Sequence, residues 1–266
     1  MIENPKSGRV KRVAALARKK DRLLTGRFLV EGPQSVRELL RFRPELVETV
    51  FATTGTEPWQ HEIDRLASEQ GVELTRTTEP VLAAMAETVT PQGVLAVARI
   101  EPPPLEQAIS GARLVVILYE IRDPGNAGTV LRAADAAGAD AVIFAGESID
   151  PWHPKVVRST TGSLFHLPVV TVPRLADAIT AVRTAGLAVL AADVHGAELA
   201  PADPALTSPV AWVFGNEARG LAESDRALAD RALRLPIYGE AESLNLATAA
   251  SVCLYTTAFA QRATAA

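Results

Sequence analysis

The chain has 266 residues, of which 48% are hydrophobic and 22% are charged, a composition typical of a globular protein and not of a disordered one. That length suits one large domain or two small ones. The single cysteine excludes an internal disulfide and a cysteine-based zinc site. The N-terminus lacks the apolar segment of a secretory signal, and no apolar run approaches the roughly 18–20 residues that span a bilayer, so we expect a soluble cytoplasmic protein.

The formal net charge of −4 is the sum of two unlike regions. Residues 1–43 hold twelve Lys and Arg and four Asp and Glu, a net charge of +8, and the rest of the chain carries −12. An acidic protein with a basic front end can bind a polyanion through that region. Charge alone is equally compatible with nucleic-acid binding and with a solvated, partly disordered basic tail.

The first hundred residues alternate helix-like and strand-like segments. Apolar spacing predicts a basic amphipathic helix over residues 8–20, Gly26 interrupts it, and Pro33 opens a second helix. Strands are expected at 28–30, 46–52, 72–75 and 93–100, with a further helix at 57–70. These segments predict a small α/β domain over residues 1–100.

Three consecutive prolines lie in the segment 101–111, which predicts a semi-rigid linker. Residues 112–266 then form a second domain with a clearer α/β series. It begins with an apolar run at 114–118, typical of a strand buried on both faces of a parallel sheet. Further strands are expected at 141–144, 167–172, 187–191, 210–214 and, at an edge, 234–237, and helices at 129–137, 175–185 and 244–260.

A glycine-containing loop, Asp123 to Gly128, follows the first strand of this domain. Glycines let the backbone approach a ligand, and the N–H groups of a helix start favour anions. The loop is not G-x-G-x-x-G, and no acidic residue ends the next strand, which argues against a dinucleotide fold. Arg132 lies one turn above the loop, at the edge of the sheet where α/β proteins bind ligands, so it is a candidate functional residue and not an ordinary surface arginine.

Two more loops follow strands in the same way. Gly215, Asn216 and Glu217 follow a buried strand, and taken alone this turn is weak evidence of function. A third loop precedes Ser243, which we expect to be the N-cap of the long terminal helix. That helix is so apolar that it must be buried, within the chain or against another one. Cys253 on it is expected to be a packed thiol and not a nucleophile.

Metal-site and triad chemistry are not expected. The four histidines are scattered without paired spacing: His61, His153, His166 and His195. Ser243 lies in no G-x-S-x-G elbow. We expect the histidines to be structural or exposed, although His195 follows a strand end and could flank a pocket.

Together, and in this order, the three loops resemble motifs 1, 2 and 3 of the SpoU (TrmH) family of RNA ribose 2′-O-methyltransferases. The matching segments are D-P-G-N-x-G-x-x-x-R at 123–132, F-G-N-E-x-x-G-L at 214–221 and L-P-I-x-G-x-x-x-S-L-N at 235–245. The stretch 154–165 is also characteristic of the family. Three motifs in order at family spacing are far more specific than any one alone. Ala218 in motif 2, where glycine is common, is a mild departure.

The resemblance implies a C-terminal SPOUT-type α/β trefoil-knot methyltransferase domain preceded by a small α/β ribosomal-protein-like RNA-binding domain. It also implies a homodimer whose interface forms the active site. The cofactor implied is S-adenosylmethionine (AdoMet), held mainly by backbone groups, with no metal. By the motif match, the cofactor-binding residues are Gly215, Asn216, Leu235, Ile237 and Leu244.

The family assigns activation of the ribose 2′-hydroxyl to the motif 1 arginine, here Arg132. Because arginine stays charged, a grip on the neighbouring phosphate fits its chemistry better than literal proton abstraction, and both alternatives remain open. Asn126 is expected to orient Arg132 or the ribose. Glu217 would hold the arginine or offset positive charge near the sulfonium. Ser243 and Asn245 would bind substrate or order their loop.

The expected RNA-binding residues are Lys11, Arg12, Lys19, Lys20 and Arg22 in the basic front end and Arg158 at the cleft. The resemblance favours 23S ribosomal RNA as the substrate, with antibiotic-resistance methyltransferases among such proteins, and leaves transfer RNA as an alternative. A catalytically silent RNA-binding or ribosome-assembly protein is a second alternative. A nucleotide-dependent oxidoreductase is a third, against which the missing dinucleotide fingerprint counts.

Overall fold

The computed structural model describes residues 1–263 and divides into two compact units. Unit 1 comprises residues 1–101 and 150–166, and unit 2 comprises the rest of the described chain. The chain first passes from one unit to the other at Glu101 and Pro102, within the proline-rich segment. Residues 150–166, which the sequence-based boundaries place in the second domain, pack in unit 1.

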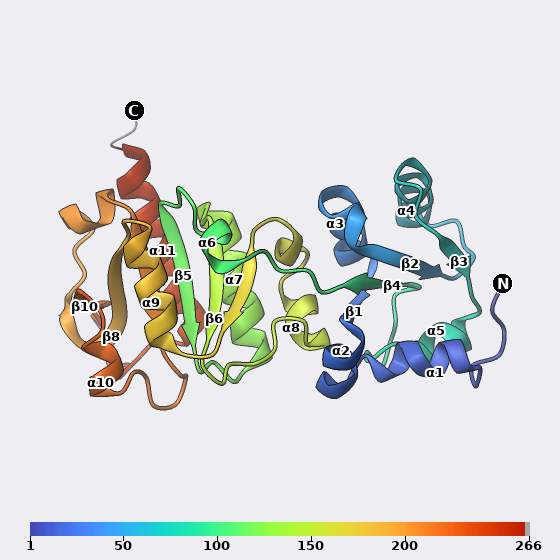
Figure 1. Ribbon diagram of the computed structural model, residues 1–266, viewed down its shortest axis with the longest axis horizontal. Coiled ribbons are helices and arrows are strands. Elements are labelled where there is room, and N and C mark those ends of the chain that lie inside the picture. Colours follow the sequence, from blue (N-terminus) through green and yellow to red (C-terminus); the bar gives the residue numbers. More distant parts are fainter. Residues whose placement is uncertain (264–266) are drawn as a thin grey trace. The chain divides into compact units, whose positions relative to one another are not determined.

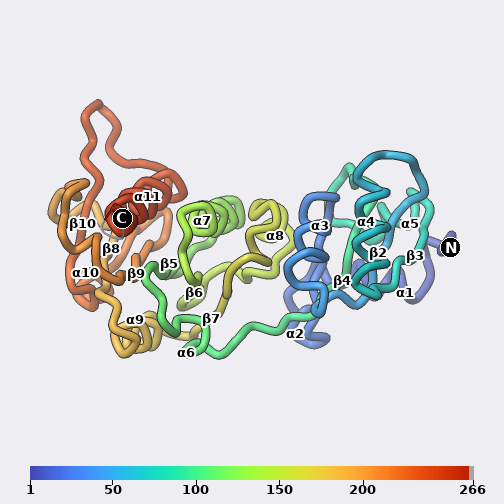
Figure 2. The backbone as a smooth tube through the Cα atoms, turned by 90° about the horizontal axis from the view of Figure 1, so that it is seen from above, coloured from blue at the N-terminus to red at the C-terminus, as the bar shows by residue number. Residues whose placement is uncertain are grey.

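Unit 1 is built on a four-stranded sheet in the order β1-β4-β2-β3 (Figure 1). Its strands are β1 (Arg27–Glu31), β2 (Val47–Ala52), β3 (Leu74–Arg76) and β4 (Val94–Arg99), of which β2 and β3 run parallel and the other pairs antiparallel. Its helices are α1 (Gly8–Ala15), α2 (Lys19–Thr25), α3 (Pro33–Phe42), α4 (Pro58–Glu69), α5 (Glu79–Met85) and α8 (Pro154–Ser159), with 3-10 turns at Pro44–Leu46 and Ser163–Phe165. Helices α1 and α5 cover one face of the sheet, and α3 and α4 pack together on the opposite face (Figures 1 and 2).

The basic N-terminal segment is folded, so the interpretation as a disordered tail is wrong. Helix α1 buries Val10 and Val13 in the core of unit 1. The prediction of one helix over residues 8–20 is also wrong, because α1 ends at Ala15 and the backbone of Arg18 is extended (φ −92°, ψ 134°) before α2 begins. The break leaves carbonyl groups that no further helical turn can satisfy. Arg22 of α2 folds back to donate to two of them.

Unit 2 has a six-stranded, entirely parallel sheet in the order β10-β8-β9-β5-β6-β7. Its strands are β5 (Leu114–Tyr119), β6 (Ala141–Ala145), β7 (Val169–Val172), β8 (Ala188–Glu198), β9 (Val210–Phe214) and β10 (Arg231–Arg234). Its helices are α6 (Leu105–Ala108), α7 (Pro124–Ala137), α9 (Leu175–Thr184), α10 (Glu223–Arg226) and α11 (Leu246–Ala263), with a 3-10 turn at Pro204–Thr207. Helices α6 and α9 lie on one face of the sheet, and α7 and α11 pack together on the other (Figure 1). Both faces are therefore covered, which explains the continuous apolar runs of β5 and β9.

Two expectations about element ends in unit 2 are wrong. The segment 123–128 is not a loop but the start of α7, because Asp123 caps the helix by accepting the N–H of Asn126 at 2.7 Å and Pro124 occupies the first turn. The edge strand β10 ends at Arg234, and Pro236 lies beyond it. Among residues 1–263, no helix is long and apolar enough to cross a membrane.

A buried hydrogen bond fastens α11 to the centre of the sheet. Trp212 of β9 and Thr257 of α11 are both fully buried, and the indole Nε1–H donates to Thr257 Oγ1 at 2.9 Å. The same hydroxyl donates to the carbonyl of Cys253 at 2.9 Å. The helix that borders the candidate site is thus held in register with the strand that leads into it.

We expect Thr257→Val to destabilise the protein by about 1–3 kcal/mol, because the indole N–H would stay buried without an acceptor. Thermal unfolding followed by circular dichroism measures the effect. Thr256→Val is the matched control, since Thr256 is only half-buried and its hydroxyl makes the same kind of bond within the helix, to the carbonyl of Val252. Equal melting temperatures for the two variants would show that the Trp212 contact contributes nothing.

Candidate active site

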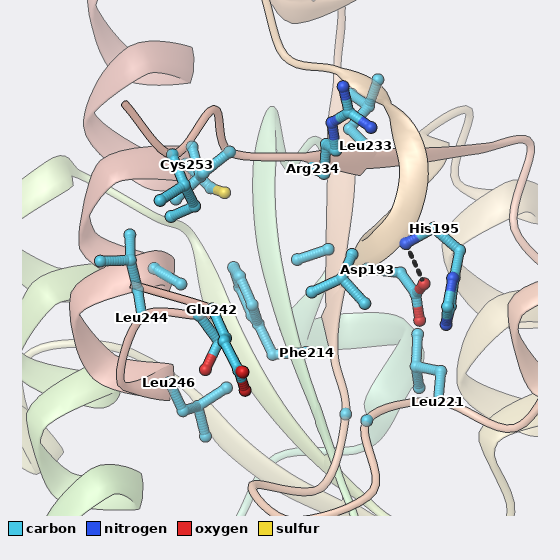
Figure 3. Close-up of a pocket in the computed structure, with 18 of the residues that line it drawn as sticks. Asp193, His195, Phe214, Leu221, Leu233, Arg234, Glu242, Leu244, Leu246 and Cys253 are labelled. Carbon is cyan, nitrogen blue, oxygen red and sulfur yellow. Dashed lines mark hydrogen bonds between the residues drawn. The ribbon is translucent and has the colours of Figure 1, made fainter. Parts of the chain in front are cut away.

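A cavity of about 750 Å³ opens at the carboxyl ends of β8, β9 and β10 (Figure 3). Parallel strands place the segments that follow them at one edge of a sheet, and three such segments line this cavity together with the first turns of α11. Its volume lies within the range of small-molecule sites, about 300–1,000 Å³. All five residues that the motif match assigns to the cofactor line it: Gly215, Asn216, Leu235, Ile237 and Leu244.

The turn after β9 forms one wall and leaves no room for a side chain at Gly215. A Cβ at this buried position would lie 2.7 Å from the backbone carbon and oxygen of Gly220. Asn216 shapes the same turn, because its Oδ1 accepts the N–H groups of Ala218 and Arg219 at 3.0 and 3.3 Å. Its Nδ2 donates to the carbonyl of Glu120 at 2.8 Å. The asparagine thus orders the loop while one side of it faces the cavity.

The segment after β10 forms the facing wall. Within the described chain, the backbone groups of residues 235–244 form no hydrogen bond with another residue. Polar backbone groups need partners, so these are available to a ligand or to water. Leu235, Ile237 and Leu244 add apolar side chains to the same wall. The wall therefore combines apolar contact with free backbone donors and acceptors.

Cys253 lies at the α11 side of the cavity (Figure 3). Burial raises the pKa of its thiol to about 12, which confirms the prediction of a packed, unreactive thiol. His195 lines the cavity, as expected, but it lies within β8 and not after a strand end, because β8 runs on to Glu198 instead of ending near residue 191. Sequence reasoning missed Asp193, a buried carboxylate that accepts the N–H of His195 at 2.8 Å and pairs with Arg226 at 3.2 Å. Its place two residues before His195 was the available signal.

Side chains from all three motifs meet beside the cavity. Glu217 of motif 2 accepts the backbone N–H groups of Arg122 and Asp123 at 3.2 and 3.1 Å. The same carboxylate accepts Asn126 Nδ2 of motif 1 at 3.4 Å. Asn126 Oδ1 in turn accepts Asn245 Nδ2 of motif 3 at 3.0 Å. This chain of contacts, Glu217–Asn126–Asn245, joins segments that are more than ninety residues apart in the sequence.

Two expectations in this region differ from the structure. Glu217 and Asn126 do not hold the Arg132 of their own chain, because within residues 1–263 their partners are the groups just named and the Arg132 side chain has no hydrogen bond or ion pair; their alternative roles, beside the sulfonium and at the ribose, stay predictions. Ser243 is not the N-cap of the terminal helix. Asn245 is the cap, since its Oδ1 accepts the N–H groups at the start of α11 at 2.8 and 3.4 Å, while Ser243 is exposed at the cavity.

Arg132 is exposed on α7 and does not line the cavity. It lies one helical turn before Ala136, whose carbonyl accepts the hydroxyl of Tyr255 on α11 at 3.3 Å. Tyr255 belongs to an exposed apolar stripe on α11 with Val252 and Phe259, which are 43% and 67% exposed. The arginine therefore lies beside an apolar surface of unit 2 that the described chain leaves uncovered.

The expected RNA-binding residues fall into two groups. Lys11, Arg12, Lys19 and Lys20 are exposed on α1 and α2. Arg22 is only 1% exposed and pairs with Asp150 at 2.6 Å, so the prediction that it binds phosphate is corrected to a structural role. Arg158 pairs with Glu31 at 3.2 Å and Glu87 at 2.7 Å, which ties α8 to unit 1. No cluster of potential metal ligands occurs in the part of the chain that the structure describes.

The cavity segments and the motif residues fall within one family model. Residues 113–255 match the model of the SpoU rRNA Methylase family. The chain belongs to this family. Residues 7–96 of this SpoU methylase match a second model, the MRM3-like substrate binding domain. The expected fold class, a parallel α/β methyltransferase domain with an α/β domain before it, is confirmed.

Full-length relatives and solved structures agree with the SpoU assignment. The 23S rRNA (guanosine(2553)-2′-O)-methyltransferase RlmP of Bacillus subtilis (strain 168) is 34% identical over 260 residues, 96% of this chain and 97% of its own. The 23S rRNA (uridine(2479)-2′-O)-methyltransferase of Streptomyces viridochromogenes is 32% identical over 257 residues, 91% of this chain and 86% of its own. The SpoU methyltransferase AviRb from Streptomyces viridochromogenes superposes with a TM-score of 0.85 at 30% identity, covering 97% of this chain and 99% of that one. An AdoMet-bound rRNA methyltransferase from Sinorhizobium meliloti gives 0.83 at 30% identity, covering 96% of each chain.

Proposed function

We propose that this chain is an AdoMet-dependent RNA methyltransferase that acts on a ribose 2′-hydroxyl of 23S ribosomal RNA. The observation that carries the proposal is the pair of hydrogen bonds that joins Glu217 to Asn126 and Asn126 to Asn245, which brings the three family motifs together beside the cavity. The relatives named above, which span nearly the whole chain, are 23S rRNA 2′-O-methyltransferases. Such an enzyme meets its substrate in the cytoplasm, the location that the sequence predicts.

The cavity fits AdoMet. The apolar side chains of Leu235, Ile237 and Leu244 suit the faces of an adenine ring, and the free backbone groups of residues 235–244 suit its polar edge. The space above Gly215, which a side chain would remove, lets the ligand approach the backbone. When bound, AdoMet supplies a methyl group on an electrophilic sulfonium. Asp193 and Glu217 line the cavity and would supply negative charge to offset that sulfonium.

The chain must also activate the ribose hydroxyl, which is a poor nucleophile at neutral pH. Arg132 is the proposed group because it is exposed and has no partner among residues 1–263. Its guanidinium can bind the phosphate next to the target ribose through two hydrogen bonds, which brings the phosphate or Arg132 itself to the hydroxyl. Positioning the two reactants in line supplies much of the acceleration.

The active site is completed by a second copy of the chain. Val252, Tyr255 and Phe259 form an exposed apolar stripe on α11, and Arg132 lies beside it on α7. Exposed apolar stripes of this kind mark protein interfaces. A two-fold dimer through this stripe brings Arg132 of one copy to the interface, from which it can reach the cavity of the other. The dimer therefore explains why Arg132 does not line the cavity of its own chain.

Methyl transfer from radiolabelled AdoMet to RNA tests the function. We expect labelling of 23S ribosomal RNA transcripts at one ribose, mapped by its resistance to alkaline cleavage, and none of transfer RNA transcripts. Labelling of transfer RNA alone would replace the proposed substrate by the alternative one. A folded protein that binds RNA but shows no heat on titration with AdoMet would instead support the silent RNA-binding protein.

A further inference from the structure

Helix α2 in unit 1 buries a charged side chain and exposes its apolar ones, the opposite of the usual arrangement. Its one buried residue is Arg22, which is 1% exposed, whereas Leu23 and Leu24 are 73% and 79% exposed. A helix of a globular protein normally buries its leucines and turns its charged side chains to solvent. These two leucines therefore contribute little to the core of the described chain, and their exposure needs another explanation.

Arg22 holds α2 in place through polar contacts. Its Nε and Nη2 donate to Asp150 Oδ2 at 2.8 and 2.6 Å, and its Nη1 donates to the carbonyls of Leu16 and Ala17 at 2.9 and 2.8 Å. A guanidinium is costly to bury unless its donors are paired, and here each of these three nitrogens has a partner. The fold thus fixes a helix whose outer surface is apolar, so the leucines stand on a rigid support.

Lysines accompany the exposed leucines. Lys19 and Lys20 precede Leu23 and Leu24 by four residues, which places each lysine on the same side of the helix as one leucine. Both lysines are exposed, and neither forms an ion pair within residues 1–263. The one acidic residue of α2, Asp21, follows the two lysines and is paired with Arg18 at 2.7 Å. The surface is therefore basic and apolar at once.

We infer that this surface, Lys19, Lys20, Leu23 and Leu24, binds unpaired nucleotides of the RNA. The lysines neutralise phosphates, and the leucines cover the faces of unstacked bases. In a duplex those faces are stacked on one another and hidden, whereas in loops and bulges they are free to contact apolar side chains. The surface therefore distinguishes looped from fully paired RNA. The inference rests on the proposed function, because it requires unit 1 to bind the RNA substrate.

The test compares two double variants on two RNAs, a hairpin with an unpaired loop from 23S ribosomal RNA and a blunt duplex of equal length. Leu23→Ser with Leu24→Ser should weaken hairpin binding by about tenfold or more, leave duplex binding unchanged, and leave the salt dependence as it was. Lys19→Gln with Lys20→Gln should weaken binding of both RNAs and lower the slope of log affinity against log salt by about 1.5. Fluorescence anisotropy at several salt concentrations gives all of these values.

Val89→Ser is the matched control, because Val89 is 101% exposed in the same unit and has no lysine four residues before it. It should bind both RNAs like the wild type. A fluorophore on the Leu24→Cys variant gives a second readout that does not depend on the serine variants being stable. The label reaches this site selectively, since Cys253 is buried. Its emission should shift with the hairpin and not with the duplex.

The inference is overturned if the leucine variant binds the hairpin as tightly as the wild type does. It is equally overturned if that variant changes the sedimentation coefficient and not the RNA affinity, because the leucines would then contact another copy of the chain. Failure of the proposed function has a different signature. In that case the wild type methylates no RNA, whatever the leucine variants do to binding.

Discussion

Replacement of Arg132 by alanine is expected to lower the rate of methyl transfer by about a hundredfold to ten-thousandfold, the range over which positioned acid–base and phosphate-binding groups act. The affinity for AdoMet should stay within about twofold of the wild-type value, because Arg132 does not line the cavity. Folding should be unaffected, since the side chain is exposed and has no partner in the described chain. Single-turnover kinetics with radiolabelled AdoMet and calorimetric titration measure the two quantities.

Arg132→Lys separates the two chemical roles that remain open for this residue. Lysine keeps the charge but not the two-pronged geometry, so a phosphate grip predicts partial activity at best. If Arg132 itself removed the proton, the lysine variant would gain activity steeply with rising pH, because an amine deprotonates far more readily than a guanidinium. Arg174→Ala is the control for loss of a surface arginine, since that side chain is 75% exposed and its ion pair is with the neighbouring Asp177. Undiminished turnover by Arg132→Ala would remove the residue from the mechanism.

Replacement of Gly215 by alanine is expected to weaken AdoMet binding by about tenfold to a hundredfold. The added Cβ would lie 2.7 Å from the backbone of Gly220 and 2.8 Å from Leu221, so the turn that forms one cavity wall must shift. Overpacking of this kind costs about 1–3 kcal/mol, which corresponds to that loss of affinity when the cost falls on the bound state. Calorimetric titration of the folded variant with AdoMet gives the dissociation constant.

Gly239→Ala is the matched control for this substitution. Gly239 lies on the loop between β10 and α11, its φ is not in the left-handed region, and a Cβ there meets no atom within 4 Å. It should therefore bind AdoMet like the wild type. Equal affinities for the Gly215 and Gly239 variants would mean that the turn after β9 does not shape the cofactor site.

The same two substitutions test whether the active site is shared between copies. A dimer that combines Arg132→Ala in one chain with Gly215→Ala in the other retains one intact site only if Arg132 acts on the cavity of its partner. At an AdoMet concentration that suffices for the wild type but lies well below the dissociation constant of Gly215→Ala, random pairing of equal amounts of the two variants should then restore about a quarter of wild-type activity. If Arg132 acts on its own cavity, the mixture should stay as inactive as its components. Sedimentation velocity on the same samples checks the proposed dimer.

Local sequence signals located most of the elements of unit 2 within a few residues. Apolar runs predicted β5, β6 and β9, because strands buried on both faces of a sheet are apolar throughout. A glycine predicted the end of α7, because Gly138 adopts the left-handed conformation of a helix C-cap. Both signals act over a few residues. The break between α1 and α2 was missed because it depends on a distant partner, Asp150, which holds Arg22 in place. The start of α7 was also wrong, although its cap, Asp123, lies directly before the helix.

The candidate site shows the same division. The motif spacing singled out the residues that line the cavity, because the edge of a parallel sheet collects whatever follows its strands. It did not give the contacts of Glu217 with Asn126 and of Asn126 with Asn245, because these join residues 91 and 119 positions apart and no local pattern encodes them. The cap of α11 was wrong although its contacts are local, because Ser243 and Asn245 are both suitable caps by residue type.

The opposite charges of the two regions were determined by the sequence alone, and so was the presence of a basic region suited to a polyanion. The tertiary structure decided which of those charges are available. Lys19 and Lys20 stay exposed on α2, whereas Arg22, two residues further on, is buried against Asp150, an acid that lies 128 residues away. The amino-acid composition gives the number of charged residues but not which of them are paired in the folded chain. Whether an arginine binds RNA or holds its own fold together depends on which group the folded chain brings within hydrogen-bonding distance of it.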